Sequence, residues 1–406
     1  MTDQARMYLR LGLFLLLVSA LGVGLYFLLF VRPPSVVPGE TPDETGISGG
    51  LPTAGDGSPN GGGVTGGGLP GGASALTPSA VANGGLTSSI VLTTSAIVDP
   101  QTGGSGVTYY DPNDGRFYRI NARGEVEAIE GLNYPGAERV AIAPDTNKAV
   151  VEFPDGANII VDLANKTQQT LPAHWEQFYF SPDSSQIAAK SMPADANNRA
   201  LIITSADGSS TSVVAALGEN ANKVHASISP VKDIVAFSAT GAGGTSFGQN
   251  TIYLVSPDGQ ATSSIVVNGS AFENVWSPNG SNFIYSVADS GDEYRPSLWY
   301  SDKRGDRQGA IRLRIPLKTT ADKCIFADDS TLYCAVPKEA PAGSGADSAL
   351  FRGGDSLVKV SLPSGSTSIL AELVLETSME NLSLSPDGSS LYYTDRLGRL
   401  SLMKIR

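Results

Sequence analysis

The sequence predicts an all-β fold built from repeats, on three observations. A short phrase recurs after residue 95, in which an apolar strand passes through Ser-Pro-Asp or a variant into a second apolar strand. The composition, with Gly 46, Pro 25 and 17% charged residues, favours many short strands joined by turns. Residues 95–406 show no helical periodicity. The copies read VAIAPDTNKAVVEF, FYFSPDSSQIAAKS, ASISPVKDIVAFSA, NVWSPNGSNFIYSV and LSLSPDGSSLYYTD.

The spacing of this phrase indicates the kind of repeat. A sixth, degenerate copy, CIFADDSTLYCAV, has Asp328 where the other copies have proline. Successive copies lie roughly 40–60 residues apart, and each is followed by a second hairpin such as ALIITSADGSSTSVV. Four strands in each repeat, labelled A to D from the axis outward, form a blade of a β-propeller.

Seven blades result when the two ends of the chain are combined. The last repeat, residues 380–406, has three recognisable strands, NLSLS, LYYTD and RLSLMKIR. Residues 87–94, TSSIVLTT, form a β-rich segment that no other repeat claims. If this segment supplies the missing outer strand, both termini close the ring and no long strand edge stays open. Six and eight blades are the alternatives.

The Ser-Pro-Asp-Gly phrases resemble the Pro-Asp, WD-like propeller repeats of TolB-like periplasmic proteins and of prolyl-oligopeptidase-like peptidases. The resemblance covers residues 95–406 and implies the fold rather than a function, because many activities share it. No α/β-hydrolase domain accompanies the repeats, so peptidase chemistry is not implied. TolB is soluble and carries a separate N-terminal domain, so its partners are not implied either.

The N-terminus predicts a membrane anchor. Residues 11–31 form an uncharged apolar run long enough to cross the roughly 30 Å of a bilayer core. Arg6 and Arg10 precede it, and after Arg32 the next basic residue is Arg116. By the positive-inside rule, residues 1–10 are cytoplasmic and the propeller lies outside, anchored once in the cytoplasmic (inner) membrane. A cleaved signal peptide is the alternative, although its apolar core spans only about 7–15 residues.

A flexible linker follows the anchor. Residues 32–86 contain stretches such as SPNGGGVTGGGLPGGASA, which have no hydrophobic period and cannot bury a core. The predicted domains are therefore a cytoplasmic N-terminus (1–10), a signal anchor (11–31), a disordered linker (32–86) and the propeller (87–406).

The sequence offers little for catalysis. His174 and His225 are the two histidines, and no G-x-S-x-G elbow accompanies them. Two His and two Cys without ligand spacing predict no metal site, although Asp289, Asp292 and Glu293 cluster in one loop. A net charge of -12 argues against nucleic acid as a partner. We expect no catalytic residue, no metal and no cofactor.

Cys324 and Cys334 predict a disulfide. They are equidistant from a turn centred near Asp329, and therefore face each other across an antiparallel strand pair. An extracytoplasmic location permits the bond. Two reduced, buried thiols are the alternative.

Chain direction predicts which rim of the propeller carries function. The A–B and C–D turns are tight, whereas the B–C loops and D–A connections on the other rim are long. One polar residue lies five positions before the Pro (or Asp328) of each repeat, and these six residues should ring the channel mouth on the second rim. They are Arg139, Gln177, His225, Glu273, Lys323 and Asn381. Trp175, Phe351 and Arg352 are candidate anchors on that rim. Two interpretations stay open for these six residues: they line a water-filled polar channel, or they form a binding site.

The sequence therefore predicts a non-enzymatic propeller tethered in the cell envelope that binds protein or peptide partners. A glycan- or cell-wall-binding module is one alternative. A hydrolase or lyase is the other, and it would require two carboxylates about 5–10 Å apart in the channel.

Overall fold

The computed structural model describes residues 78–104, 106–121, 123–241 and 248–406. The predicted cytoplasmic segment, membrane helix and most of the linker (1–10, 11–31 and 32–77) lie outside these residues. Within the described ranges, no helix is long and apolar enough to cross a membrane.

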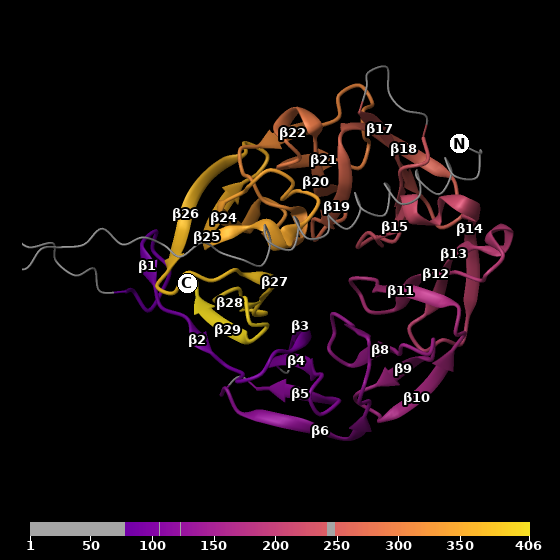
Figure 1. Ribbon diagram of the computed structural model, residues 1–406, viewed down its shortest axis with the longest axis horizontal. Coiled ribbons are helices and arrows are strands. Elements are labelled where there is room, and N and C mark those ends of the chain that lie inside the picture. Colours follow the sequence, from indigo (N-terminus) through magenta and orange to yellow (C-terminus); the bar gives the residue numbers. More distant parts are fainter. Residues whose placement is uncertain (1–77, 105, 122, 242–247) are drawn as a thin grey trace, which may run out of the picture. The chain divides into compact units, whose positions relative to one another are not determined.

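Seven antiparallel sheets of four main strands follow one another around a ring, and this confirms the predicted seven-bladed propeller (Figure 1). Blade 1 contains β3 (Val98–Gly103), β4 (Gly106–Asp111), β5 (Arg116–Ile120) and β6 (Val126–Asn133). Blade 2 contains β7 (Arg139–Ile142), β8 (Lys148–Glu152), β9 (Asn158–Asp162) and β10 (Thr167–Leu171). Blade 3 contains β11 (Trp175–Phe180), β12 (Gln186–Ser191), β13 (Ala200–Ser205) and β14 (Thr211–Ala216). Blade 4 contains β15 (Val224–Ala226), β16 (Ala236–Ser238), β17 (Gln249–Val255) and β18 (Ala261–Asn268).

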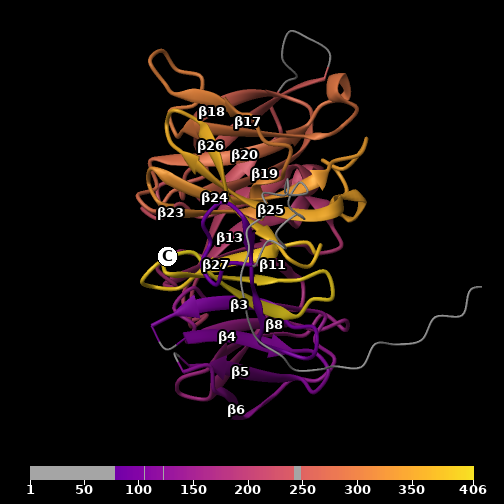
Figure 2. The ribbon, with the colours of Figure 1, turned by 90° about the vertical axis from the view of Figure 1, so that its left-hand side faces the viewer.

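The remaining blades follow the same order. Blade 5 contains β19 (Ser270–Trp276), β20 (Asn282–Ala288), β21 (Pro296–Asp302) and β22 (Arg312–Ile315). Blade 6 contains β23 (Cys324–Asp328), β24 (Thr331–Glu339), β25 (Arg352–Ser361) and β26 (Ser366–Leu373). Blade 7 contains β27 (Glu380–Leu384), β28 (Ser390–Thr394) and β29 (Leu400–Lys404). Its yellow strands lie beside the indigo strands of blade 1 (Figure 2).

The Ser-Pro-Asp-Gly phrase works as a turn, as predicted. In the last copy, Asp387 accepts hydrogen bonds from the Ser385 hydroxyl at 2.6 Å and from the Ser389 N–H at 3.0 Å. The bond from Ser385, together with those from Ser389, lowers the pKa of Asp387 to about 2. Gly388 adopts φ 64°, which a glycine tolerates without steric cost. The carboxylate therefore fixes the A–B turn and is not free for chemistry.

The core lies between the blades. Ala188 and Leu201 of blade 3 pack with Val224 and Ala226 of blade 4 in one buried cluster. Equivalent clusters join blades 1 and 2 and blades 6 and 7. The apolar positions two residues before the repeat Pro contribute to this packing. They are Ile142, Ile228 and Phe326, which are buried, and Phe180, Trp276 and Leu384, which are half-buried.

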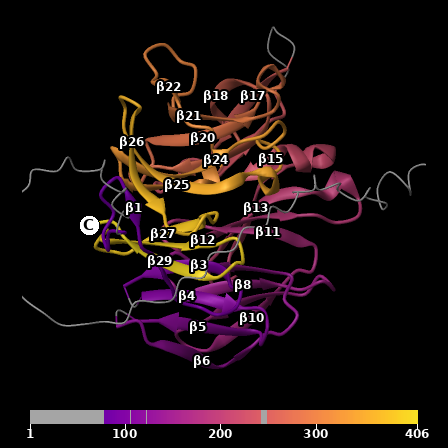
Figure 3. The same ribbon diagram turned by 60° about the vertical axis from the view of Figure 1, so that its left-hand side comes forward.

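The N-terminal segment closes the ring, as predicted. β2 (Ile90–Val91) pairs antiparallel with β29, with Ile90 opposite Leu402 and Val91 opposite Ser401. The structure adds a second attachment, because β1 (Leu86–Thr87) pairs parallel with β26 as a fifth strand of blade 6. The indigo segment runs beside the yellow strands of both blades in Figures 1 and 3.

The folded domain also begins earlier than the predicted boundary at residue 87. The Ala82 N–H donates to the Lys404 carbonyl at 2.9 Å, and the Gly84 N–H donates to the Leu370 carbonyl at 2.8 Å. These residues were assigned to the linker because they show no hydrophobic pattern. They belong to the domain because backbone groups, which carry no sequence signal, hold them.

The two rims differ as the sequence predicts. Five 3-10 helices occur in the described ranges, and every one lies in a B–C loop or a D–A connection. They are η1 (Ala196–Asn198), η2 (Gly218–Lys223), η3 (Ser290–Asp292), η4 (Ala321–Lys323) and η5 (Ser348–Leu350). We call this side, with its longer connections, the loop rim.

Candidate binding site at the channel mouth

The innermost strands begin on the loop rim, and several of them contain a bulge there. The register of β11 against β12 shifts between Glu176 and Tyr179, and Gln177 at the shift has φ 58°. Asn381 in β27 lies at the equivalent shift with φ 50°. A bulge re-aims the side chains beside it. Two of the six predicted ring residues therefore occupy irregular backbone at the mouth.

Arg139 and Gln177 are tied to one carboxylate between blades 2 and 3. Arg139 is exposed and lies directly opposite Glu152 in the β7–β8 ladder. Burial raises the pKa of Glu152, while the Arg139 charge and a hydrogen bond from the Gln177 backbone N–H oppose that shift. This part of the ring joins neighbouring blades.

Glu273 forms a carboxyl pair with Asp322 of η4, between blades 5 and 6. The pKa of Glu273 is raised to about 8, first by desolvation and then by the charge and hydrogen bond of Asp322. Both side chains reach solvent, yet protein crowds Glu273 enough to favour its neutral form. Glu273 is therefore protonated near neutral pH and can donate to Asp322.

Lys323 is buried rather than open to the channel. Its Nζ lies 2.9 Å from Asp355 Oδ2 and donates to the Met379 carbonyl at 2.9 Å. The Met379 N–H donates to the same carboxylate at 2.6 Å, and the ammonium lies 5.9 Å from the Phe351 ring centre. Lys323 therefore joins blade 6 to the connection that enters blade 7.

The remaining predicted positions are divided between packing and exposure. Asn381 donates to the Thr394 hydroxyl at 2.9 Å. Trp175 is half-buried and packs against the cluster between blades 2 and 3. Phe351 is half-buried beside Lys323, whereas Arg352 is exposed at the start of β25. Phe351 and Arg352 line a cleft of about 230 Å³ with Lys323 and Asp355, away from the other ring residues.

The ring residue of blade 4, His225, lies beside a pocket. Its ring lies 5.5 Å from the Tyr179 ring, nearly edge-on, across the interface of blades 3 and 4. Burial, and then the charge of Lys190, lower the pKa of His225, so the imidazole is neutral at neutral pH. Tyr179 is 38% exposed and lies within electrostatic range of Arg139 and Glu273. Tyr179 thus connects four predicted ring positions, because Gln177 and His225 line the same pocket.

This pocket has a volume of about 540 Å³, and we call it the channel-mouth pocket. Its walls combine polar and aromatic side chains from blades 3, 4 and 5. They include Gln177, Tyr179, Lys190, His225, Asn250 and Phe272. A concave site of this size with a few convergent polar groups has the usual composition of a ligand pocket.

Sequence reasoning missed Tyr179 and Lys190. Both lie in the phrase FYFSPDSSQIAAKS but outside the aligned polar position. A signal was present for Lys190, since it follows Ile187, Ala188 and Ala189 in a strand that is buried on both faces. A lysine in such a strand is rarely buried unless it is paired.

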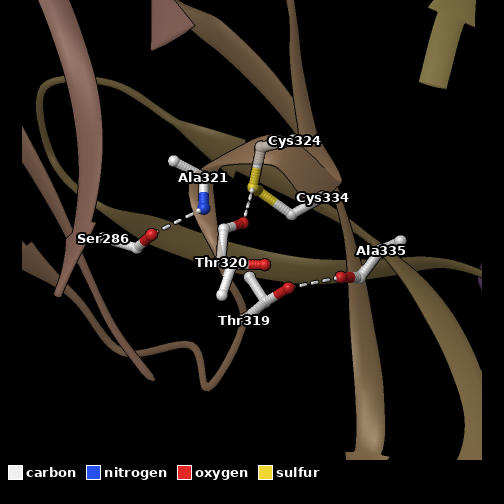
Figure 4. Close-up of a disulfide and its surroundings, with 7 residues drawn as sticks. All are labelled: Ser286, Thr319, Thr320, Ala321, Cys324, Cys334 and Ala335. Carbon is white, nitrogen blue, oxygen red and sulfur yellow. Dashed lines mark hydrogen bonds between the residues drawn. A yellow bond between two sulfur atoms is a disulfide. The ribbon is translucent and has the colours of Figure 1, made fainter. Parts of the chain in front are cut away.

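The cysteines lie below the loop rim in blade 6. Cys324 and Cys334 are directly opposite in the β23–β24 ladder, with Cα atoms 4.0 Å apart and the two sulfurs bonded. η4 approaches this pair, with the Ala321 N–H donating to the Ser286 hydroxyl and the Thr319 hydroxyl donating to the Ala335 carbonyl (Figure 4). The disulfide is part of the wall that carries Asp322 and Lys323.

A wider cleft of about 880 Å³ is lined by blades 4 and 5 and includes the acidic loop. Asp292 there is paired with Lys318, with Arg295 at 3.8 Å and with Arg314 at 3.8 Å. The carboxylate is thus neutralised by cations of the protein itself. Across residues 78–406, as far as they are described, no group of three or more His, Cys, Asp or Glu could hold a metal.

No family model matches the chain, and no curated protein matches it. Solved structures resemble it in fold. An oligogalacturonate lyase in complex with manganese has a TM-score of 0.54 at 15% identity, covering 78% of this chain and 92% of that chain. An oligogalacturonate lyase from Vibrio parahaemolyticus has 0.51 at 12%, covering 78% and 93%. The propeller domain of Cps50 (Swd1) from Myceliophteria thermophila has 0.51 at 10%, covering 78% and 100%.

Likeness at these identities shows the fold alone. The chain is a β-propeller, and its TolB-like character remains a resemblance of repeat sequence.

Proposed function

We propose that this chain is a non-enzymatic binding module of the cell envelope, anchored by residues 11–31 and presenting its propeller outside the cytoplasmic membrane. Its channel-mouth pocket binds a protein or peptide partner. In this proposal residues 32–77 act as a tether, and a Gly-, Pro- and Ser-rich composition suits a long reach from the membrane.

One observation carries this proposal. Several polar residues of the ring already have partners within the protein, as Lys323 has in Asp355 and the Met379 carbonyl and Asn381 has in Thr394. The channel-mouth pocket is different, because Lys190 and His225 face it while making no hydrogen bond to the described parts of the chain. Polar groups held on a rigid scaffold without internal partners are available to a ligand.

The Cys324–Cys334 bond supports the proposed location. Disulfides persist in oxidising compartments outside the cytoplasm and are rare inside it. The basic asymmetry around residues 11–31 supports the same orientation.

An enzyme is the second candidate, and the Glu273–Asp322 carboxyl pair is where its chemistry would be sought, although the spacing of the pair does not fit glycosidic cleavage. The two carboxyl groups are in hydrogen-bonding contact, which is closer than the about 5–10 Å that glycosidic cleavage requires. The lyases of similar fold make an oligogalacturonate the natural substrate to try. Unchanged chain length after prolonged incubation would argue against this candidate, and cleavage that Glu273→Gln abolishes would favour it.

Site-specific photocrosslinking tests the binding module. Benzoylphenylalanine at Asn222 would face the channel-mouth pocket, and at Val231 it would face solvent in an A–B turn on the opposite rim. In cells carrying the full chain, we expect a discrete adduct from position 222 and none from position 231. Identical adducts at both positions, or none at 222, would contradict the proposal.

A further inference from the structure

Two lysines are buried among the residues that the structure describes, and only Lys323 forms an ion pair there. Lys323 is 2% exposed and is satisfied by Asp355 and the Met379 carbonyl. Lys190 is 6% exposed, yet within the described ranges its ammonium makes no hydrogen bond or ion pair. The Lys190 Nζ is not one of the buried side-chain atoms that lack a partner, so the stem of the side chain is covered while the ammonium reaches the pocket, where it is open to an external anion.

The orientation of Lys190 follows from the alternation of β12. Ala188 packs toward blade 4, whereas Ile187 and Ala189 pack toward blade 2. Lys190 is two residues beyond Ala188, so its side chain also points toward blade 4 and into the channel-mouth pocket.

The charges near Lys190 leave it unneutralised. Glu176 is directly opposite in the β11–β12 ladder and acts on Lys190 electrostatically, but it is exposed and forms no ion pair with it. Lys223 at the mouth of the pocket adds a second positive charge. His225 is the other titratable group on the facing strand, and its neutral ring can donate one hydrogen bond. The pocket is therefore locally positive within a chain of net charge -12.

Aromatic and aliphatic side chains border this positive point. Tyr179, Phe272 and Ile252 line the pocket beside Lys190. A ligand that fits carries one anionic group next to an apolar side chain, as a peptide does. A polyuronate carries a charge on every sugar, and the net negative charge of the propeller would repel such a chain.

We infer that the channel-mouth pocket binds a carboxylate of a peptide, with Lys190 as its counter-ion, His225 as a hydrogen-bond donor and the Tyr179–Phe272 wall contacting the adjacent side chain. This inference rests on the proposed function and specifies its ligand. The carboxylate belongs either to the C-terminus or to an Asp or Glu side chain.

Direct binding to the full chain in detergent micelles tests the inference. The probes are random octapeptides that lack Asp and Glu, carry an uncharged BODIPY label and have a free C-terminus, the same peptides as C-terminal amides, and amidated peptides with one Glu. We expect the first or third set to be retained at least about tenfold better than the second, as for a charge-assisted hydrogen bond. Equal retention of the uncharged amides would overturn the inference.

Substitutions assign the effect to Lys190. We expect Lys190→Met to reduce retention of the preferred peptides by about 10- to 100-fold, and Lys190→Arg to restore most of it. Lys223→Met, at the exposed edge of the same pocket, should change retention less than about threefold. Thermal melting of each variant verifies folding, and the peptide comparison above decides the question if Lys190→Met does not fold. Full retention by folded Lys190→Met would overturn the inference.

The outcomes separate the inference from the proposed function. Peptide binding that ignores both the carboxylate and Lys190 would overturn the inference and leave the binding module standing. No retention of any peptide, together with no crosslink at position 222, would overturn both. Trigalacturonate that competes better than the best peptide would overturn the choice of a peptide in favour of an acidic glycan.

Discussion

The Leu400 N–H donates a hydrogen bond to the Thr93 hydroxyl at 2.9 Å, although 307 residues separate the two in sequence. The Leu92 N–H donates in turn to the Leu400 carbonyl at 2.7 Å. These bonds continue the short β2–β29 ladder and cover the outer edge of blade 7. They join the first described segment of the chain to the last, so the ring is closed by both ends.

Removal of this segment should weaken the ring. A chain that begins at Ser95 lacks β1 and β2 and loses several closing hydrogen bonds, each worth about 0.5–1.5 kcal/mol. We expect a clearly lower urea midpoint than for a chain that begins at residue 78. A chain that begins at Ser88 loses β1 and the backbone bonds of Ala82 and Gly84 but keeps β2, and it should unfold between the two. Equal midpoints for all three would show that the segment does not stabilise the ring.

The Lys323–Asp355 pair should be essential for stability. Lys323→Met leaves a buried carboxylate with only the Met379 N–H, and removing one partner of a buried pair costs about 3–5 kcal/mol. The double variant Lys323→Met/Asp355→Leu should recover most of this loss in urea unfolding. Lys338→Met breaks an exposed pair with Glu376 and should cost no more than about 1 kcal/mol. A loss from Lys323→Met as small as that from Lys338→Met would disprove the structural role.

The Glu273–Asp322 pair should make stability depend on pH. The pKa of Glu273 is raised from 4.5 to about 8, so the folded state holds a proton that the unfolded state releases across this window. Stability from this group is therefore greatest below about pH 4.5 and falls as pH rises toward 8. Glu273→Gln keeps a hydrogen-bond donor for Asp322 but cannot titrate. The loss of stability between pH 5 and pH 8.5, measured as the difference in urea midpoint, should therefore be smaller in this variant. Because Glu273 reaches solvent, we expect a difference below about 1 kcal/mol.

Glu219→Gln, an exposed substitution in η2, serves as the control and should leave the pH dependence of wild type. A decline that persists unchanged in Glu273→Gln would assign it to other groups.

The cysteines should be linked in protein taken from its native compartment. Alkylation before lysis, followed by non-reducing mass spectrometry, should recover the Cys324 and Cys334 peptides as one species. Because the bond closes a short hairpin loop, its loss in Cys324→Ser/Cys334→Ser should cost less than the roughly 3 kcal/mol expected for a 15-residue loop. Alkylated thiols at both positions would mean that the pair is reduced.

The anchor should stay attached, with the propeller outside. Residues 11–31 are apolar, Arg6 and Arg10 precede them, and after Arg32 no basic residue occurs until Arg116. Protease added to intact spheroplasts should therefore digest residues 78–406, while a cytoplasmic marker protein stays intact. Protection of the propeller would reverse the topology, and a soluble mature form would indicate signal-peptide cleavage.

Prediction from sequence succeeded where a local pattern carries the information. The Ser-Pro-Asp-Gly phrase fixes each A–B turn through contacts within a few residues, as Asp387 shows with Ser385 and Ser389. Cys324 and Cys334 lie equally far from the centre of one turn. Counting residues along the hairpin therefore predicts that they lie opposite each other, as they do. Residues 79–86 were misassigned to the linker because backbone hydrogen bonds to blades 6 and 7 leave no trace in side-chain pattern.

The sequence by itself determined the repeat, the number of blades, the rim that bears the long connections and the strand that closes the ring. These follow from short-range periodicity and from the need to cover a strand edge. Only the tertiary structure decided which polar residues are free. Lys323 aligns with the ring in sequence and is paired with Asp355, whereas Lys190 lies in an apolar strand and has no ion-pair partner among the described residues. The packing of strands and connections decides which charges meet, since Asp355 of β25 and the Met379 carbonyl both reach Lys323 and no ion pair among the described residues reaches Lys190.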